Sequence, residues 1–190
     1  GLRDIRASVQ AVNGHVSLHF NADGQQVGHI DVNGAGNLQS DGGHFSIAAD
    51  APVSGNAKID IPSLAWVGSL IAPSLIVEGR LQSTIALNGT YAAPHLTGAI
   101  TGNALRLFFI EQGIDLRHGT LDSEFKDNGL LVKQLRFQSP DGDVEVSGPI
   151  NWSEGKTTAH LALQADRFVL FNRVDRRLVV SGKSRIDWND

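Results

Sequence analysis

Apolar and polar residues alternate along most of this 190-residue chain, and this period of two constrains the fold more than any other feature. Residues 130–150, LLVKQLRFQSPDGDVEVSGPI, show the pattern well. Before the Ser-Pro-Asp-Gly stretch at 139–142, apolar residues occupy odd-numbered positions: Leu131, Leu135 and Phe137. After it, they occupy even-numbered positions: Val144, Val146 and Ile150. Such alternation predicts strands with one apolar and one polar face, and the four turn residues predict a hairpin between them.

The same alternation recurs between glycine-rich turns throughout the chain. Further runs lie at 14–20, 28–34, 42–50, 78–91, 103–116, 120–125, 159–171 and 177–188. Asn128-Gly129 between two such runs is a strong hairpin signal. We therefore predict an all-β protein with roughly ten to twelve strands.

The longest apolar run, residues 64–77, lacks this alternation. Gly68 and Pro73 interrupt it, and a membrane-spanning helix needs about 20 apolar residues. We predict one short helix from Ser63 to about Ala72, with Ser63 as its N-cap and Pro73 ending it.

Three compositional features exclude broad classes of function. The formal net charge of -4 gives no basic excess for nucleic acid binding. The chain has no cysteine, which excludes disulfides, thiolate zinc sites and a cysteine nucleophile, and which fits an oxidising compartment. It also has no methionine, so we expect a fragment of a longer protein.

No catalytic motif is complete. The SGKS sequence at 181–184 resembles a phosphate-binding loop, but Arg177 occupies the position of its first glycine. The NGAGNLQ sequence resembles a dinucleotide fingerprint, but Gln39 replaces the third glycine. No G-x-S-x-G sequence occurs. We therefore expect a protein that is not an enzyme and that needs no cofactor.

Two groups of polar residues could bind ions. His15 and His19 lie on one face of a predicted strand and could hold a metal, although two solvent-facing side chains explain the spacing as well. The Asp-Gly-Asp sequence at 141–143 could suggest calcium, but a turn explains it. We predict no metal site.

A basic cluster lies near the C-terminus. It comprises Arg173, Arg176 and Arg177, interrupted by Asp175. A solvated turn is the default interpretation, and contact with an anionic lipid headgroup is the alternative.

Faint internal repeats suggest how the chain is organised. The sequences VEVSGPINW and LVVSGKSRIDW match most closely: two apolar positions, Ser-Gly, then a strand ending in Trp152 or Trp188. We predict a single all-β unit over 1–190, with approximate repeats at 1–62, 78–150 and 151–190 and a helical insert at 63–77. Repeated strand-turn units favour an elongated, stacked sheet.

Four phrases within residues 89–150 occur in an order typical of a known family. They are Gly89-Thr90 followed by Pro94 and 96–98 (LTG), GIDLRHGTLDSEF at 113–125, GLLVKQLRF at 129–137, and Ser147-Gly148. This segment resembles a repeat unit of the TamB family, AsmA-like proteins of the bacterial envelope. The tail from His160 to Trp188 resembles the next unit, and the resemblance is looser before residue 78.

The resemblance implies a fold and a function. Family members form a long, strongly curved sheet, a "β-taco", with an apolar interior, and they resemble bridge-like lipid transfer proteins. An N-terminal helix anchors them in the inner membrane of Gram-negative bacteria, and they extend across the periplasm. They are implicated in phospholipid transport to the outer membrane and, with the barrel partner TamA, in outer-membrane protein assembly. Membrane association would come through the parent protein.

The apolar faces of the predicted strands need a cover, which could be lipid acyl chains in an open trough or a second sheet in a closed sandwich. The apolar rows are aliphatic and rich in phenylalanine, with few polar anchors, which favours lipid. The predicted lining residues are Leu105, Leu107, Phe109, Leu121, Phe125, Leu131, Leu135, Phe137, Val144, Val146, Leu161 and Leu163. The helix at 63–72 could plug or cap the trough.

Two other functions remain open from the sequence. One is a closed β-sandwich of the adhesin type, with a polar binding face. The other is a chaperone-like segment that offers strand edges to unfolded outer-membrane barrel proteins or autotransporters.

Overall fold

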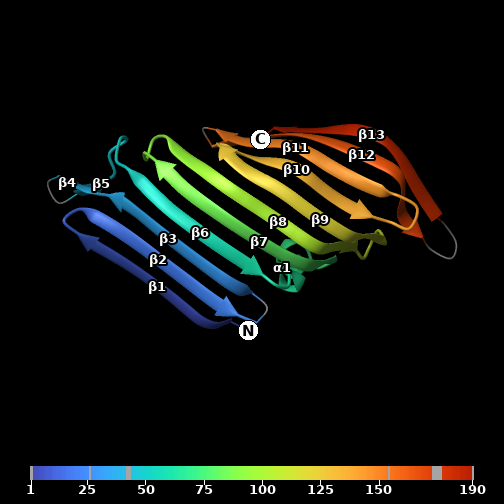
Figure 1. The fold of residues 1–190 in the computed structure, drawn as a ribbon, viewed down its shortest axis with the longest axis horizontal. Helices are drawn as coiled ribbons and strands as arrows, with labels where there is room; N and C mark the ends of the chain where they lie inside the picture. The colour runs from blue at the N-terminus through green and yellow to red at the C-terminus, as the bar shows by residue number, and fades with distance from the viewer. Residues whose placement is uncertain (1, 26, 42–43, 154, 173–176, 190) are drawn as a thin grey trace.

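The computed structural model describes residues 2–25, 27–41, 44–153, 155–172 and 177–189. Its main feature is one open antiparallel sheet of eleven strands, in the order β1-β2-β3-β6-β7-β8-β9-β10-β11-β12-β13 (Figure 1). These strands are β1 (Leu2–Val12), β2 (His15–Gly24), β3 (Gly28–Asn37), β6 (Val53–Ile61), β7 (Leu75–Gly89), β8 (Pro94–Phe109), β9 (Ile114–Asp127), β10 (Gly129–Gln138), β11 (Asp143–Ser153), β12 (Lys156–Asn172) and β13 (Arg177–Asn189). The predicted all-β class is confirmed.

Almost every strand pairs with the next one along the chain, so the sheet is a meander. The one departure lies between β3 and β6, where β4 (Gln39–Asp41) and β5 (His44–Ser46) form a separate two-stranded ribbon. The hairpin predicted over 130–150 is β10 with β11, closed by a hydrogen bond from Ser139 N to Gly142 O of 2.8 Å. The hairpin predicted at 128–129 joins β9 to β10; Gly129 pairs with Lys126 and so belongs to the strand.

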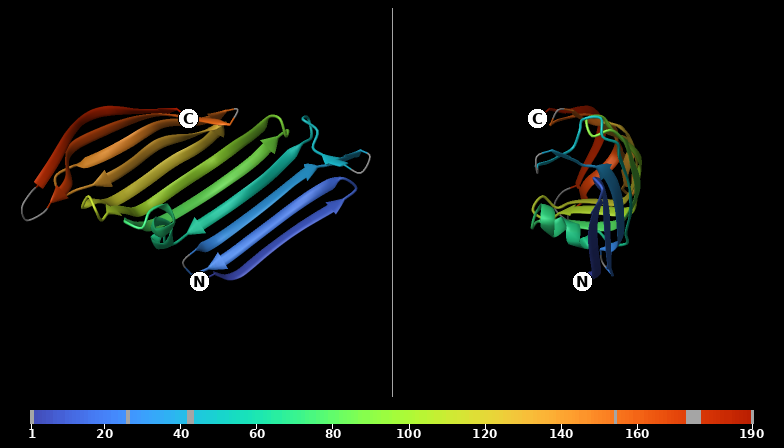
Figure 2. Two further views of the ribbon diagram at one scale, coloured as in Figure 1. Left: turned by 180° about the vertical axis from the view of Figure 1, so that it is seen from behind. Right: turned by 90° about the vertical axis from the view of Figure 1, so that its left-hand side faces the viewer.

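The sheet curves into an arc when seen from its end, with the helix inside the hollow (Figure 2). We call the side that carries the helix the inner face and the opposite side the outer face. Ala104, His118 and Arg167 have positive φ and lie where the strand registers of β8, β9 and β12 shift. Bulges of this kind bend a strand and increase its twist, so they contribute to the curvature.

Close side-chain packing over glycine also helps the sheet to bend. A Cβ on Gly119 of β9 would lie 2.5 Å from a ring carbon of Phe137 on β10. The aromatic ring therefore covers the glycine backbone directly, and no larger residue fits at this position.

The helix α1 (Ala65–Ile71) lies at one end of the inner face and packs on β7. It falls within the predicted helix. Its N-cap is Leu64, however, without a side-chain cap; the predicted cap, Ser63, accepts only a long hydrogen bond of 3.4 Å from Ala65 N. Ala72 is extended, as expected for a residue before proline, and ends the helix.

No helix in the described parts of the chain is long and apolar enough to cross a membrane.

The best-buried core lies beside α1, at the end of the sheet where α1 and the bent part of β12 cover the inner face. Leu64, Val77, Leu105, Phe137 and Phe168 form it together with Ala165. Phe168, only 2% exposed, reaches it because β12 turns at Arg167 and comes to lie against β9. The turn is held by Val169 N, which donates to Ser139 Oγ at 3.0 Å. We call this the closed end of the sheet.

Candidate functional site

Strand register places the apolar side chains of the inner face in rows that cross the sheet. Leu81 and Ile85 are four residues apart on β7 and thus share a face, and Leu81 packs against the core at α1. From Ile85, the printed cross-strand partners can be followed in both directions to β1 and to β13. This complete inner row consists of Ala7, Phe20, Val32, Ala57, Ile85, Gly98, Phe125, Leu130, Ile150, Ala159 and Trp188.

Every member of the complete inner row is apolar or glycine, over eleven strands. The neighbouring row does contain hydroxyl groups, at Ser83 and Ser123. Both donate to backbone carbonyls, Ser83 Oγ to Ala99 O at 2.9 Å and Ser123 Oγ to Ile100 O at 3.0 Å. Because their hydroxyl groups are already hydrogen-bonded, these serines add little polarity to the inner face.

Within the described parts of the chain, the inner face is covered mainly at the closed end. The main contacts between elements that are not sheet neighbours join α1 to β7 and β12 to β9. Among the described residues there is no second large sheet opposite these rows, so they do not form the core of a closed sandwich. Most side chains of the complete inner row are half-buried, and Trp188 at its edge is 50% exposed. We call the open part of the inner face the trough.

Small residues make room in the trough. In one row, Gly34 and Gly55 stand side by side between Leu18 and Leu87. The two glycines contribute no side-chain volume, so this row is low between its two leucines. Chemically, the trough can bind long apolar groups and offers few polar anchors for orienting a small polar ligand.

Eleven of the twelve predicted lining residues share the inner face. They are Leu105, Leu107, Phe109, Leu121, Phe125, Leu135, Phe137, Val144, Val146, Leu161 and Leu163. Six of them, at positions 105, 107, 121, 135, 137 and 144, pack at the closed end.

Leu131, the twelfth predicted lining residue, lies on the outer face and is 40% exposed. The prediction for this residue is wrong because the register of β10 shifts between Val132 and Leu135. The shift reverses the parity, so that Leu130 and Val132 point inward in its place.

The sequence prediction also missed several inner-face residues. Phe168 was missed because the bulge at Arg167 reverses parity in β12. The β1–β6 half of the trough, including Phe20 and Val32, was not assigned, although its alternation carries the same signal.

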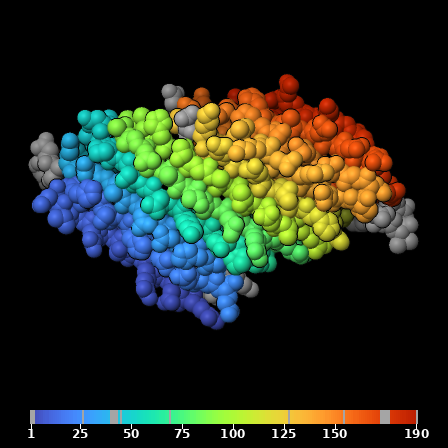
Figure 3. Space-filling view, viewed as in Figure 1, coloured from blue at the N-terminus to red at the C-terminus, as the bar shows by residue number. Residues whose placement is uncertain are grey.

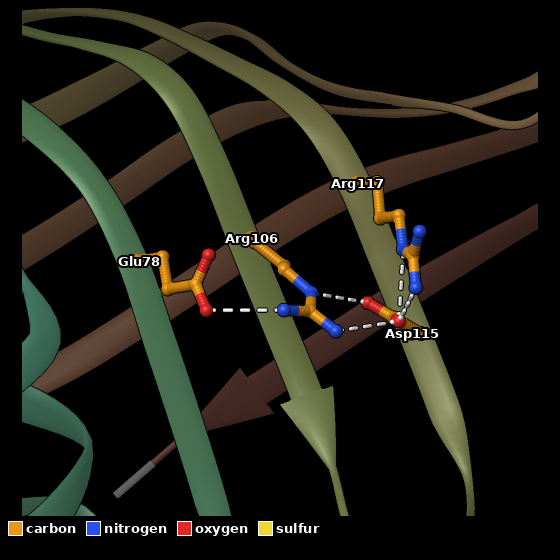
Figure 4. A network of polar contacts seen from close by, with 4 residues as sticks. All are labelled: Glu78, Arg106, Asp115 and Arg117. Carbon is orange, nitrogen blue, oxygen red and sulfur yellow. Dashed lines mark hydrogen bonds and ion pairs between the residues drawn. The ribbon is translucent and has the colours of Figure 1, made fainter.

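Successive strands cross the outer face as diagonal bands (Figure 3), and on this face polar side chains hydrogen-bond from one strand to the next. On this face, Arg106 of β8 donates to Asp115 of β9 through Nε and Nη2, both at 2.8 Å, and to Glu78 of β7 at 3.0 Å (Figure 4). Arg117 donates to the same Asp115. These hydrogen bonds, chiefly that from Arg106, lower the pKa of Asp115 from 3.8 to about 2. The network ties three strands together.

A hollow of about 850 Å³ lies near the closed end, between the β8–β9 turn and the bent part of β12. It combines the apolar Phe108 and Leu170 with Arg117 and Arg177. Arg117 is paired with Asp115, and Arg177 with Asp141. These carboxylates offset the attraction of the hollow for an anion. Two arginines of the predicted basic cluster, at 173 and 176, lie outside the described residues, so headgroup contact there remains a prediction.

The polar motifs singled out from the sequence are structural in this fold. His15 and His19 share the outer face, and the ring of each hydrogen-bonds to an asparagine. His15 Nδ1 lies 2.9 Å from Asn37 Oδ1, and His19 Nδ1 lies 2.6 Å from Asn33 Oδ1. Within the described ranges, no group of three or more His, Asp or Glu side chains could hold a metal ion. Residues 181–184 lie inside strand β13.

Comparisons of this chain with protein-family models, with curated proteins and with solved structures found no match. The resemblance to the TamB family therefore remains a prediction.

Proposed function

We propose that this chain holds the acyl chains of phospholipids in its trough. The observation that carries the proposal is the complete inner row, in which each of the eleven strands of the sheet presents an apolar side chain or a glycine to the open face. An apolar surface of this extent is costly to leave in water and needs an apolar partner. A long, flexible hydrocarbon chain suits a face that is continuous and curved.

The expected affinity follows from the transfer of methylene groups. Burying about 16 methylenes at roughly 0.8 kcal/mol each contributes on the order of 10 kcal/mol. Contacts spread evenly over leucine, isoleucine, valine and phenylalanine fix no single position along the trough. A lipid can therefore be held and still slide, which is what conduction of lipid requires.

The resemblance to the TamB family supports a wider proposal. In it, the chain is a segment of an inner-membrane-anchored periplasmic protein that moves phospholipid between the inner and outer membranes. Its parent would work with the barrel protein TamA in outer-membrane protein assembly. The proposal assigns the chain no catalytic step and no cofactor.

Photocrosslinking tests where the lipid lies. Benzoylphenylalanine placed at Ile85 points into the trough, and at the adjacent Thr84 it points to the outer face. After irradiation in a Gram-negative envelope, phospholipid adducts should form at position 85 and be far fewer at position 84. Folded protein without adducts at position 85, or with equal adducts at both positions, would count against the proposal.

A second candidate function is strand addition, and the sheet edges favour it. β1 and β13 each pair on one side only, β13 is exposed along all thirteen residues, and neither strand contains proline. Natural proteins usually protect such edges with proline, inward charges or short strands. A chaperone-like segment could accept a strand of an unfolded barrel protein here.

Peptide chemistry separates the two functions. A peptide from a barrel strand should bind the edges, and the same peptide N-methylated at alternate residues should not, because methylation removes the backbone donors that strand addition needs. Equal binding of both peptides would reject strand addition.

A further inference from the structure

A second hollow, of about 610 Å³, lies on the outer face over β1, β2, β3, β6 and β7. These strands are coloured blue to green in Figure 3. Its floor is one cross-strand row of small side chains. Ser17 of β2 pairs with Ala35 of β3, which pairs with Ser54 of β6. The low floor exists because these three side chains are smaller than those of the next row.

The next row forms a wall of imidazole and amide groups. His19, Asn33 and Asn56 are successive cross-strand partners on β2, β3 and β6. His19 Nδ1 lies 2.6 Å from Asn33 Oδ1, and Asn33 Nδ2 donates to Asn56 Oδ1 at 3.2 Å. Asn33 Nδ2 also donates to Asp31 Oδ1 at 2.7 Å, which fixes the orientation of its amide. The wall is thus an ordered set of polar groups.

Among the residues that the structure describes, the lining of this hollow carries no Asp, Glu, Lys or Arg, although such residues make up 19% of the chain. Gln10 and Asn88 add further amide groups at its two ends. By contrast, a third hollow at the other end of the same strands is lined by Arg3, Asp4 and other charged residues. A site built from neutral donors and acceptors has no fixed charge to attract a phosphate group or a metal ion.

The position of the hollow also disfavours a peptide. Most of it lies over β2, β3 and β6, which are interior strands paired on both sides. Their backbone groups are already used in the sheet, so an extended peptide cannot add to them as a strand. The ligand must instead bind through side chains. Asparagine and glutamine amides each offer a donor and an acceptor close together, which suits ligands with neighbouring hydroxyl groups.

We propose that this hollow binds a neutral oligosaccharide. Sugar rings bear several hydroxyl groups that can both donate and accept, and they match a shallow, open surface of amide, hydroxyl and imidazole groups. The lipid trough lies on the opposite face of the sheet, and of its residues Leu18, Gly34 and Gly55 also border the hollow.

Nuclear magnetic resonance titration with chitotetraose and maltotetraose, two neutral probes, tests the proposal. At least one of them should shift the side-chain amide signals of Asn33, Asn56 and Asn88. The variant Ala35→Ile raises the floor but keeps all donors, and Asn56→Ala removes one amide. Each should weaken binding about tenfold, the usual effect of losing one good hydrogen bond or its equivalent in contact.

Ala99→Ile is the matched control, since it makes the same substitution on the outer face of β8, outside the hollow. It should leave binding unchanged. Three results would overturn the proposal: no shift with either probe in folded protein, equal binding by wild type and Ala35→Ile, or tighter binding of a heparin tetrasaccharide, which is anionic.

Discussion

Leu130 and Leu131 are neighbours in β10, yet they face opposite sides of the sheet. Leu130 belongs to the complete inner row, and Leu131 is 40% exposed on the outer face. The pair therefore provides a nearly ideal comparison, because the same substitution one residue apart changes only one face.

Leu130→Asp should abolish lipid binding, since a carboxylate in the trough opposes burial of an acyl chain. Leu131→Asp should bind lipid like the wild type. Binding of a fluorescent fatty acid measures both, and circular dichroism confirms that each variant is folded. Equal loss in both variants, or in neither, contradicts a trough on the inner face. Phe137→Asp is a poorer test, because Phe137 is only 4% exposed and its charged variant would unfold.

Phe168 fills the closed end and should matter for stability. Phe168→Ala should lower the free energy of unfolding by about 3 to 5 kcal/mol, as is usual for removing a buried phenylalanine. Urea denaturation measures it. Trp188→Ala, at a side chain 50% exposed on the edge strand, should cost much less. A small effect at Phe168 would mean that the bend of β12 does not hold the closed end together.

Asp115 should make stability depend on pH in the acid range. Its pKa is about 2 in the folded protein and 3.8 ordinarily, so the folded state favours the charged form. This stabilisation is present above about pH 4 and is lost as the pH falls through about 2; its upper limit is on the order of 2 kcal/mol. The stability advantage of wild type over Asp115→Asn should shrink between pH 4 and pH 2. A constant difference would contradict the pairing with Arg106 and Arg117.

At the scale of elements, α1 is held close to β7 through a glycine. A Cβ on Gly68 would lie 2.3 Å from Leu75 O and 3.0 Å from Val77 N. The backbone of the helix therefore rests directly on the strand. Leu64 N also donates to Gly79 O at 2.9 Å, which ties the start of the helix to the same strand.

Gly68→Val should push α1 away from β7 and uncover the closed end. Binding of the dye ANS should rise, and amide exchange should quicken at 65–71, while the strand content stays the same. Ala65→Val, at an exposed position of the same helix, controls for the cost of valine in a helix. Unchanged dye binding in Gly68→Val would show that α1 does not cover apolar surface.

The strands and the helix could be predicted from the sequence because their signals are local. Alternation identifies most strands, and Pro73 explains why α1 ends where it does. The bulges could not be predicted, since they depend on how neighbouring strands fit together. The bulges caused the two main errors of the prediction, which placed Leu131 in the trough and left Phe168 out of it. In the structure, Leu131 faces outward and Phe168 belongs to the core. Parity is reliable along a strand only up to its first bulge.

At the scale of the molecule, a single sheet with one apolar open face is an unusual arrangement. Most sheets cover an apolar face with helices or a second sheet. Among the described residues of this protein, α1 and the bent end of β12 cover the closed end and leave the rest of the inner face open. The curvature could not be derived from periodicity alone; the sequence suggested it only through the family resemblance. Because this apolar face is open, our proposal explains its rows as a binding surface and not as a core.

Native mass spectrometry tests the central claim most directly. The protein would be purified from a Gram-negative envelope without detergent, and bound lipids would be identified after extraction. We predict co-purified phospholipid in the wild type and in Leu131→Asp, and none in Leu130→Asp. A folded wild-type protein whose mass shows no lipid would contradict the proposal that acyl chains cover the trough.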